Sequence, residues 1–167
     1  MKLLANLSLI QIVGTLTLIG LTFRGAEVYA QGNQTELDSI HKLVRDYSNG
    51  FVENDSRLIR NAIGQSLVMI NGNFSGDLKD WQAHQFLNKA EIDEWISMML
   101  SNAGPFENRI EIENISLRGN SGLVVTEERG KNAFRSWEEE EVAYMLGKLS
   151  GQWKIIGIFI KNIKNPE

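Results

Sequence analysis

The period of the apolar residues changes at Gly104-Pro105, and this change constrains the fold more than any other feature of the chain. Before it, apolar residues recur at steps of three and four, which is the period of a helix that packs on one side. After it, apolar and polar residues alternate in short runs between glycine-containing turns, which is typical of strands. Helices followed by a run of strands predict an α+β domain, with the helices packed on one face of an antiparallel sheet.

The helical period predicts three helices. The first spans about 36–52, where one stripe holds Leu37, Ile40, Val44, Tyr47 and Phe51. Asp55 is placed to cap a second, short helix, and Gly64 to end it. Asn88 with Glu91 three residues later predicts the start of a third helix. One early strand, 66–70, precedes a turn at 71–77, and the segment 81–87 is aromatic but too irregular to assign.

Four strands are predicted after Pro105, at about 110–117, 123–127, 133–146 and 153–160. In the first of them the apolar phase slips by one between Ile112 and Ile115, which is the pattern of a β-bulge. The last, 153–160, is almost continuously apolar, so both of its faces should be covered.

The N-terminal segment 1–30 is predicted to be a signal peptide. Leu3 to Phe23 carries no charge, and Val28-Tyr29-Ala30 places small or branched residues where a signal peptidase cuts. Cleavage after Ala30 would leave one domain, 31–167, in the periplasm or outside the cell and free of the membrane. The alternative is an uncleaved anchor, because the 21 uncharged residues from Leu3 to Phe23 are long enough to span a bilayer, although polar residues within this run dilute its apolar character.

Composition excludes several kinds of chemistry. Cysteine is absent, which excludes disulfides, thiol catalysis and thiolate metal sites. Without Lys2, Arg24 and Glu27 the domain has 15 basic and 20 acidic residues, a net charge of −5, and its scattered cations do not suit nucleic acid. Neither a glycine-rich phosphate loop nor a histidine pair at metal-ligand spacing occurs, so we expect no cofactor and no metal.

Two stretches resemble the nuclear-transport-factor-2-like superfamily, which includes ketosteroid isomerases and SnoaL-like polyketide cyclases. They are Val44-Arg45-Asp46-Tyr47 leading to Asn54-Asp55, and Gly151-Gln152-Trp153-Lys154-Ile155 after a polar turn. The resemblance covers about 36–163. It implies a cystatin-like cone, in which N-terminal helices pack on a strongly bent antiparallel sheet in the order α-α-β-α-β-β-β-β, with a pocket between helices and sheet.

The resemblance also implies where catalytic groups would lie. Isomerases of the family have a helix-1 tyrosine eight residues before an aspartate, a spacing that Tyr47 and Asp55 reproduce, and this tyrosine donates a hydrogen bond to a developing oxyanion. The position of the isomerase base falls on Asn71, whose amide cannot take a proton near neutral pH. A second oxyanion donor should fall near Ala143, where Glu141 is the nearest carboxylate. Chemistry of the isomerase type is therefore not predicted.

Our leading hypothesis is a domain that binds a small apolar molecule or a protein partner in its cone without catalysis. The predicted ligand-binding residues are aromatic or polar and would line this cone: Tyr47, Phe51, Asn71, Trp81, His84 and Trp137. The alternative is a SnoaL-like isomerase, cyclase or lyase that uses Tyr47 with His84 or Asp80 as the base. On the Tyr47 side of the pocket, an inward carboxylate or His84 with a shifted pKa would refute binding without catalysis, and a lining of only Asn, Met and aromatic groups would refute the enzyme.

The acidic run Glu138 to Glu141, with Glu127 and Glu128 before it, is the largest charge feature. Strand residues diverge to two faces, so they do not converge on a cation as a tight calcium loop does. We therefore predict that this run forms a solvated outer face of the sheet. A homodimer through that face is left open by the family resemblance, although an acidic surface argues mildly against it.

Overall fold

The computed structural model describes residues 34–73 and 81–164. The predicted signal peptide and Asp80 lie outside these residues. The described elements are three helices and six strands: α2 (Gln34–Val52), α3 (Ser56–Ala62), β1 (Ile63–Asn73), β2 (Trp81–Phe86), α4 (Lys89–Asn102), β3 (Glu107–Arg118), β4 (Ser121–Lys131), β5 (Ser136–Leu149) and β6 (Gln152–Lys164).

The helices begin where their capping residues predict. Asp55 accepts a hydrogen bond from the backbone N–H of Arg57 at the start of α3. At α4, the side chain of Asn88 accepts from the N–H of Glu91, while the Glu91 carboxylate accepts from the N–H of Leu87, one residue before the N-cap, in a variant of the capping box. The prediction that Gly64 ends the second helix was wrong. The chain is already extended at Ile63, and Gly64 belongs to β1.

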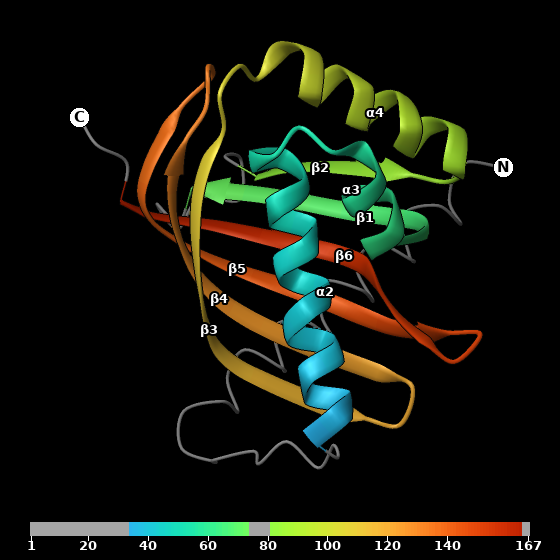
Figure 1. Cartoon of the computed structure of the whole chain (residues 1–167). Coiled ribbons are helices and arrows are strands. Elements are labelled where there is room, and N and C mark those ends of the chain that lie inside the picture. Colours follow the sequence, from blue (N-terminus) through green and yellow to red (C-terminus); the bar gives the residue numbers. More distant parts are fainter. Residues whose placement is uncertain (1–33, 74–80, 165–167) are drawn as a thin grey trace, which may run out of the picture.

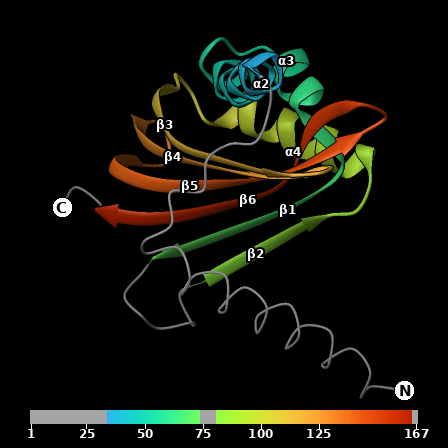
Figure 2. The same cartoon turned by 90° about the horizontal axis from the view of Figure 1, so that it is seen from below.

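The six strands form one mixed sheet in the order β2-β1-β6-β5-β4-β3. The pair β1 and β6 is parallel, and every other neighbouring pair is antiparallel. The sheet bends strongly, and the helices lie on one side of it (Figure 1) (Figure 2). The architecture is thus the predicted α+β cone.

The element order contains one strand more than predicted. Segment 81–86, left unassigned from its sequence, is β2 and pairs with 67–72 of β1. The predicted turn at 71–77 was too early, because β1 continues to Asn73. As an edge strand, β2 has four exposed residues in succession, 82–85, so it lacks the alternation that marks a half-buried strand.

One finer prediction about the strands is confirmed, and a second is confirmed for one face of the sheet. The register between β3 and β4 shifts between Ile112 and Asn114, where the apolar phase predicted a bulge. On β6, which lies between β1 and β5, Trp153, Ile155 and Ile158 are buried, whereas Ile156 and Phe159 are half-buried, so the cover expected on both faces is incomplete. The start of α2 is tied to the β5–β6 hairpin, since Glu36 accepts hydrogen bonds from Lys148 (2.7 Å) and from the indole of Trp153 (3.0 Å).

None of the helices in the described ranges combines the length and the apolar character that a membrane crossing requires.

Candidate functional site

A cavity of about 960 Å³ opens between the concave face of the sheet and the helices α2 and α4. One side of it is an aromatic wall, formed by Phe51, Phe86, Trp95, Phe106 and Trp137. Neighbouring rings in this wall lie 5.4 to 5.9 Å apart between centroids, within the range of favourable aromatic contacts. The cone is therefore not filled by its own side chains.

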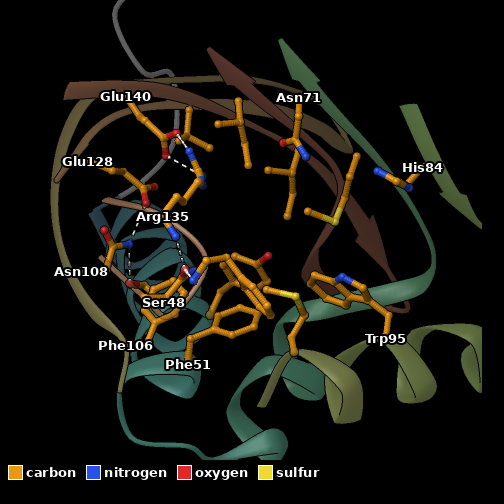
Figure 3. A pocket seen from close by; sticks show the side chains of 18 of the residues that line it. Ser48, Phe51, Asn71, His84, Trp95, Phe106, Asn108, Glu128, Arg135 and Glu140 are labelled. Carbon is orange, nitrogen blue, oxygen red and sulfur yellow. Dashed lines mark hydrogen bonds and ion pairs between the residues drawn. The ribbon is translucent and has the colours of Figure 1, made fainter. Parts of the chain in front are cut away.

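The structure brings most of the predicted site residues to this cavity. Tyr47, Phe51, Asn71, His84 and Trp137 all line it. His84 is exposed on the edge strand β2, on the opposite side of the cavity from the polar residues described next (Figure 3). The side chain of Trp81 and the whole of Asp80 lie outside the described part of the chain.

Two glutamates of the acidic run face the cavity, and this contradicts the predicted solvated face. Glu128 is 5 % exposed and Glu140 is 2 % exposed, and the two occupy directly opposite positions on β4 and β5. Both line the cavity (Figure 3). Glu141, the carboxylate expected nearest the second oxyanion donor, is exposed instead.

Strand alternation explains which glutamates turn inward. On β4, Val124, Thr126 and Glu128 are buried at steps of two, and on β5 Glu140 shares the buried face of Val142 and Tyr144. This two-residue spacing is visible in the sequence. Side chains of a strand alternate between its two faces, so a glutamate two residues from a buried valine lies on the same face as that valine, whatever its charge.

A register shift also determines what the cavity contains. Trp137 and Glu140 are three residues apart, so a regular strand would place them on opposite faces. The pairing of β4 with β5 shifts between Glu128 and Gly130, because two residues of β5 separate Trp137 from Glu140 where one residue of β4 separates Gly130 from Glu128, and both Trp137 and Glu140 are buried. A bulge in β5 thus adds an indole and a carboxylate to the same cavity wall.

The carboxylate of Glu128 is held by neutral donors. Its Oε1 accepts hydrogen bonds from the Tyr144 hydroxyl (2.6 Å) and the Thr126 hydroxyl (2.9 Å), and its Oε2 accepts one from the amide of Asn108 (2.7 Å). Burial, with the negative charge of Glu128 nearby, raises the pKa of Tyr144 well above its usual range. The same two causes raise the pKa of Tyr47. Both hydroxyls therefore keep their protons at neutral pH.

The carboxylate of Glu140 is held by a cation. Both of its oxygens accept from the guanidinium of Arg135, whose carbon lies 4.8 Å from the ring centroid of Trp137. Burial raises the pKa of Glu140, and the hydrogen bond and charge of Arg135 oppose that effect. Arg135 itself is 40 % exposed on the turn between β4 and β5, so this ion pair joins a buried group to a solvent-accessible one.

The position of Trp137 depends on a glycine. Gly130 lies opposite Trp137 on β4. A Cβ at Gly130 would stand 2.6 Å from Cζ2 of Trp137 and 2.0 Å from the backbone oxygen of Glu107. Only a residue without a side chain permits this approach of the indole to the sheet.

Three buried polar atoms in the cavity wall have no hydrogen-bond partner among the described residues. They are Oδ1 of Asn71, Oδ1 of Asn108 and Nε1 of Trp137. The orientation of Asn108 has a cause: its NH₂ group donates to Ser48 and to Glu128, and a carboxylate can only accept, so the amide oxygen must point away from Glu128. Unpartnered buried atoms are rare and call for an explanation, of which a ligand is one.

Within the described residues, no group of three His, Asp or Glu side chains is placed to hold a metal ion. Besides the tyrosines Tyr47 and Tyr144, the ionisable groups that line the cavity are four glutamates, one arginine and one histidine: Glu91, Glu94, Glu128, Glu140, Arg135 and His84. The cavity is therefore richer in acid than in base.

Comparison of the sequence with protein-family profiles found no match, and comparison with curated proteins found none either. Solved structures do match. An NTF2-like protein of unknown function from Shewanella baltica has a TM-score of 0.59 at 14 % identity, over 78 % of this chain and 95 % of its own. A cystatin-like domain from Nostoc punctiforme has a TM-score of 0.63 at 9 % identity, over 80 % and 81 %.

A ketosteroid isomerase-like protein from Erwinia carotovora is similar to the same extent, with a TM-score of 0.59 at 16 % identity over 79 % of this chain and 99 % of its own. At such identities the likeness concerns the arrangement of helices and strands, and one fold can host many functions. The chain therefore has the cystatin-like fold of the nuclear-transport-factor-2-like superfamily.

Proposed function

We propose that this domain binds a small molecule in its cone, with an apolar body against the aromatic wall and a polar end near Glu128 and Glu140. One observation carries the proposal: the cavity of about 960 Å³ combines an aromatic wall with buried polar atoms that the protein leaves unpartnered. Ligand sites typically have this character, being mostly apolar with a few polar groups that fix orientation.

The experiment uses N-phenyl-1-naphthylamine, an uncharged probe that fluoresces strongly in apolar sites. Met69 lines the cavity, whereas its neighbour Val68 is 38 % exposed and does not. Met69→Trp places a larger side chain in the cavity, and Val68→Trp is the matched control. We expect binding to the natural chain and to Val68→Trp, and at least tenfold weaker binding to Met69→Trp.

Thermal unfolding of each variant establishes that it is folded. Equal binding by both tryptophan variants would place the probe outside the cone, and no binding by the natural chain would remove the main support for the proposal.

Glu140 by itself favours a second function, acid–base catalysis. This carboxyl lies in the cavity wall with a raised pKa, which is a property of acid–base catalysts. Glu140 is an inward titratable group, which counts against the sequence-based hypothesis of binding without catalysis, and it is a further candidate for the base of an enzyme beside His84 and Asp80. Binding and catalysis are separated by Glu140→Gln, because an enzyme would lose turnover of its bound compound while retaining affinity, whereas a binding domain shows no turnover before or after the change.

Export remains a prediction. N-terminal sequencing of the mature protein tests it, since cleavage after Ala30 gives a chain that begins with Gln31 and an anchored protein still begins with Met1.

A further inference from the structure

The polar end of the cavity already contains a cation. The Arg135 guanidinium bonds both oxygens of Glu140 and lies 4.8 Å from the ring centroid of Trp137. A carboxylate beside an aromatic face is the arrangement with which proteins bind organic cations. Arg135 thus shows, within the protein itself, what kind of group this corner of the cavity accepts.

The polar groups of the cavity wall that are not engaged within the protein also favour a ligand that donates hydrogen bonds. Tyr144 donates its hydroxyl hydrogen to Glu128, and the amide of Asn108 donates to Glu128 and to Ser48, so these groups cannot donate freely to a ligand. The unpartnered oxygens of Asn71 and Asn108 are acceptors. Among the fully buried atoms the unpartnered donor is the indole N–H of Trp137, a residue 4 % exposed, and a hydroxyl beside a ligand's amine would satisfy it. Tyr47 also lines the cavity, and its hydroxyl can accept as well as donate.

The charged side chains that line the cavity also favour a cationic ligand. Glu128 and Glu140 face each other across neighbouring strands, and Arg135 is the arginine that opposes them, while no lysine of the described chain lines the cavity. A ligand carboxylate would meet two buried carboxylates. An ammonium would meet two carboxylates and one guanidinium, and that guanidinium belongs to a partly exposed side chain on a turn.

Building on the proposed function, we infer that the ligand is an organic cation, an amine with an apolar body, which displaces Arg135 from Glu140 and Trp137. Arg135 is then an internal competitor that occupies the cation position when the ligand is absent.

The test compares three probes with one hydrocarbon body: 2-naphthylmethylamine, 2-naphthylmethanol and 2-naphthoate, titrated at pH 7.4 by calorimetry. In the natural chain the amine should bind best and the carboxylate worst, with about tenfold between amine and alcohol, as expected of one partly desolvated charge contact. Glu140→Gln should remove most of the preference for the amine and leave the affinity for the alcohol unchanged within a factor of about two.

The decisive variant is Arg135→Gln, in which the competitor is gone, and we expect the amine to bind about tenfold more tightly than to the natural chain. The matched control is Lys131→Gln on the same hairpin, whose cation pairs with Glu107 at the surface and does not line the cavity. This control should change none of the three affinities. Because Arg135→Gln leaves a buried carboxylate unpaired, its stability is measured too, and the amine should raise its melting temperature more than that of the natural chain.

The outcomes separate the two proposals. If the naphthoate binds best and Arg135→Gln abolishes its binding, Arg135 is an anchor for anions; the inference is then wrong while binding in the cone stands. Equal affinities for amine and alcohol in the natural chain also overturn the inference, even if Arg135→Gln does not fold. If none of the three probes binds while N-phenyl-1-naphthylamine does, the inference fails alone; if none of the four binds, the proposed function fails with it.

Discussion

The hydrogen bond from Tyr144 to Glu128 gives the sharpest prediction about stability. Tyr144 is 2 % exposed, and its hydroxyl lies 2.6 Å from Oε1 of the buried carboxylate. Removing this donor with Tyr144→Phe leaves Glu128 with two of its three neutral donors, Thr126 and Asn108. Hydrogen bonds to charged groups contribute about 1.5–3 kcal/mol, so we expect the free energy of unfolding to fall by about 2 kcal/mol.

Urea denaturation measures this loss as a lower midpoint at an unchanged slope. Tyr47→Phe is the matched control, because Tyr47 is also buried in the cavity wall but its hydroxyl bonds no other described residue. That variant should lose at most about 0.5 kcal/mol.

A double-mutant cycle tests whether the carboxylate charge is the cause. In a Glu128→Gln background the same Tyr144→Phe change removes only a bond between neutral groups, which is worth about 1 kcal/mol. An equal loss in both backgrounds would refute the reasoning, as would a Tyr144→Phe protein as stable as the natural one.

Three further predictions concern the sheet, pH and a helix cap. Gly130→Ala should destabilise the domain by about 3 kcal/mol through overpacking and shift the fluorescence of Trp137, whereas Gly147→Ala, whose nearest contact would be 3.3 Å, should cost much less; equal midpoints in urea would contradict this. Because the folded pKa of Glu140 is raised above its unfolded value of 4.5, its contribution to stability is present below pH 4.5 and lost as the pH rises through the folded pKa. Glu140→Gln should therefore compare more favourably with the natural chain at pH 7.5 than at pH 4, and an equal difference in melting temperature at both would be the contrary result. Asn88→Ala should lower the free energy of unfolding by about 1 kcal/mol by removing the cap of α4, and Asn88→Ser should recover most of it.

Those parts of the fold that local patterns determine could be predicted from the sequence. The stripe from Ile40 to Phe51 fixed the buried face of α2, and the phase slip after Ile112 located the bulge in β3. Strand β2 was missed because an edge strand needs no alternation, so the run of exposed residues from 82 to 85 carries no period to read.

The aromatic side of the candidate site was predicted, together with Asn71 and His84, but its acidic end was not. Tyr47, Phe51 and Trp137 stand out as aromatic residues, and the cavity contains them. Glu128 and Glu140 were predicted to face solvent because they are charged. Their two-residue spacing from buried residues of the same strand, which places them on the inner face, was given less weight. Arg135 could not be found from sequence, because its contacts with Glu140 and Trp137 depend on the turn before β5 and on a register shift that places these two residues on the same face.

The parallel pairing of β1 with β6 has a consequence for how the chain folds. Strands β3 to β6 follow one another as hairpins, so each can pair with a neighbour made just before it, whereas Val68 of β1 must find Gly157 near the other end of the sequence. Such a distant contact is slow to form, so joining the two halves of the sheet should be a late event in folding. A chain shortened before Gln152 would lack the strand between β1 and β5, and its remaining strands would form two separate ribbons with no cone between them.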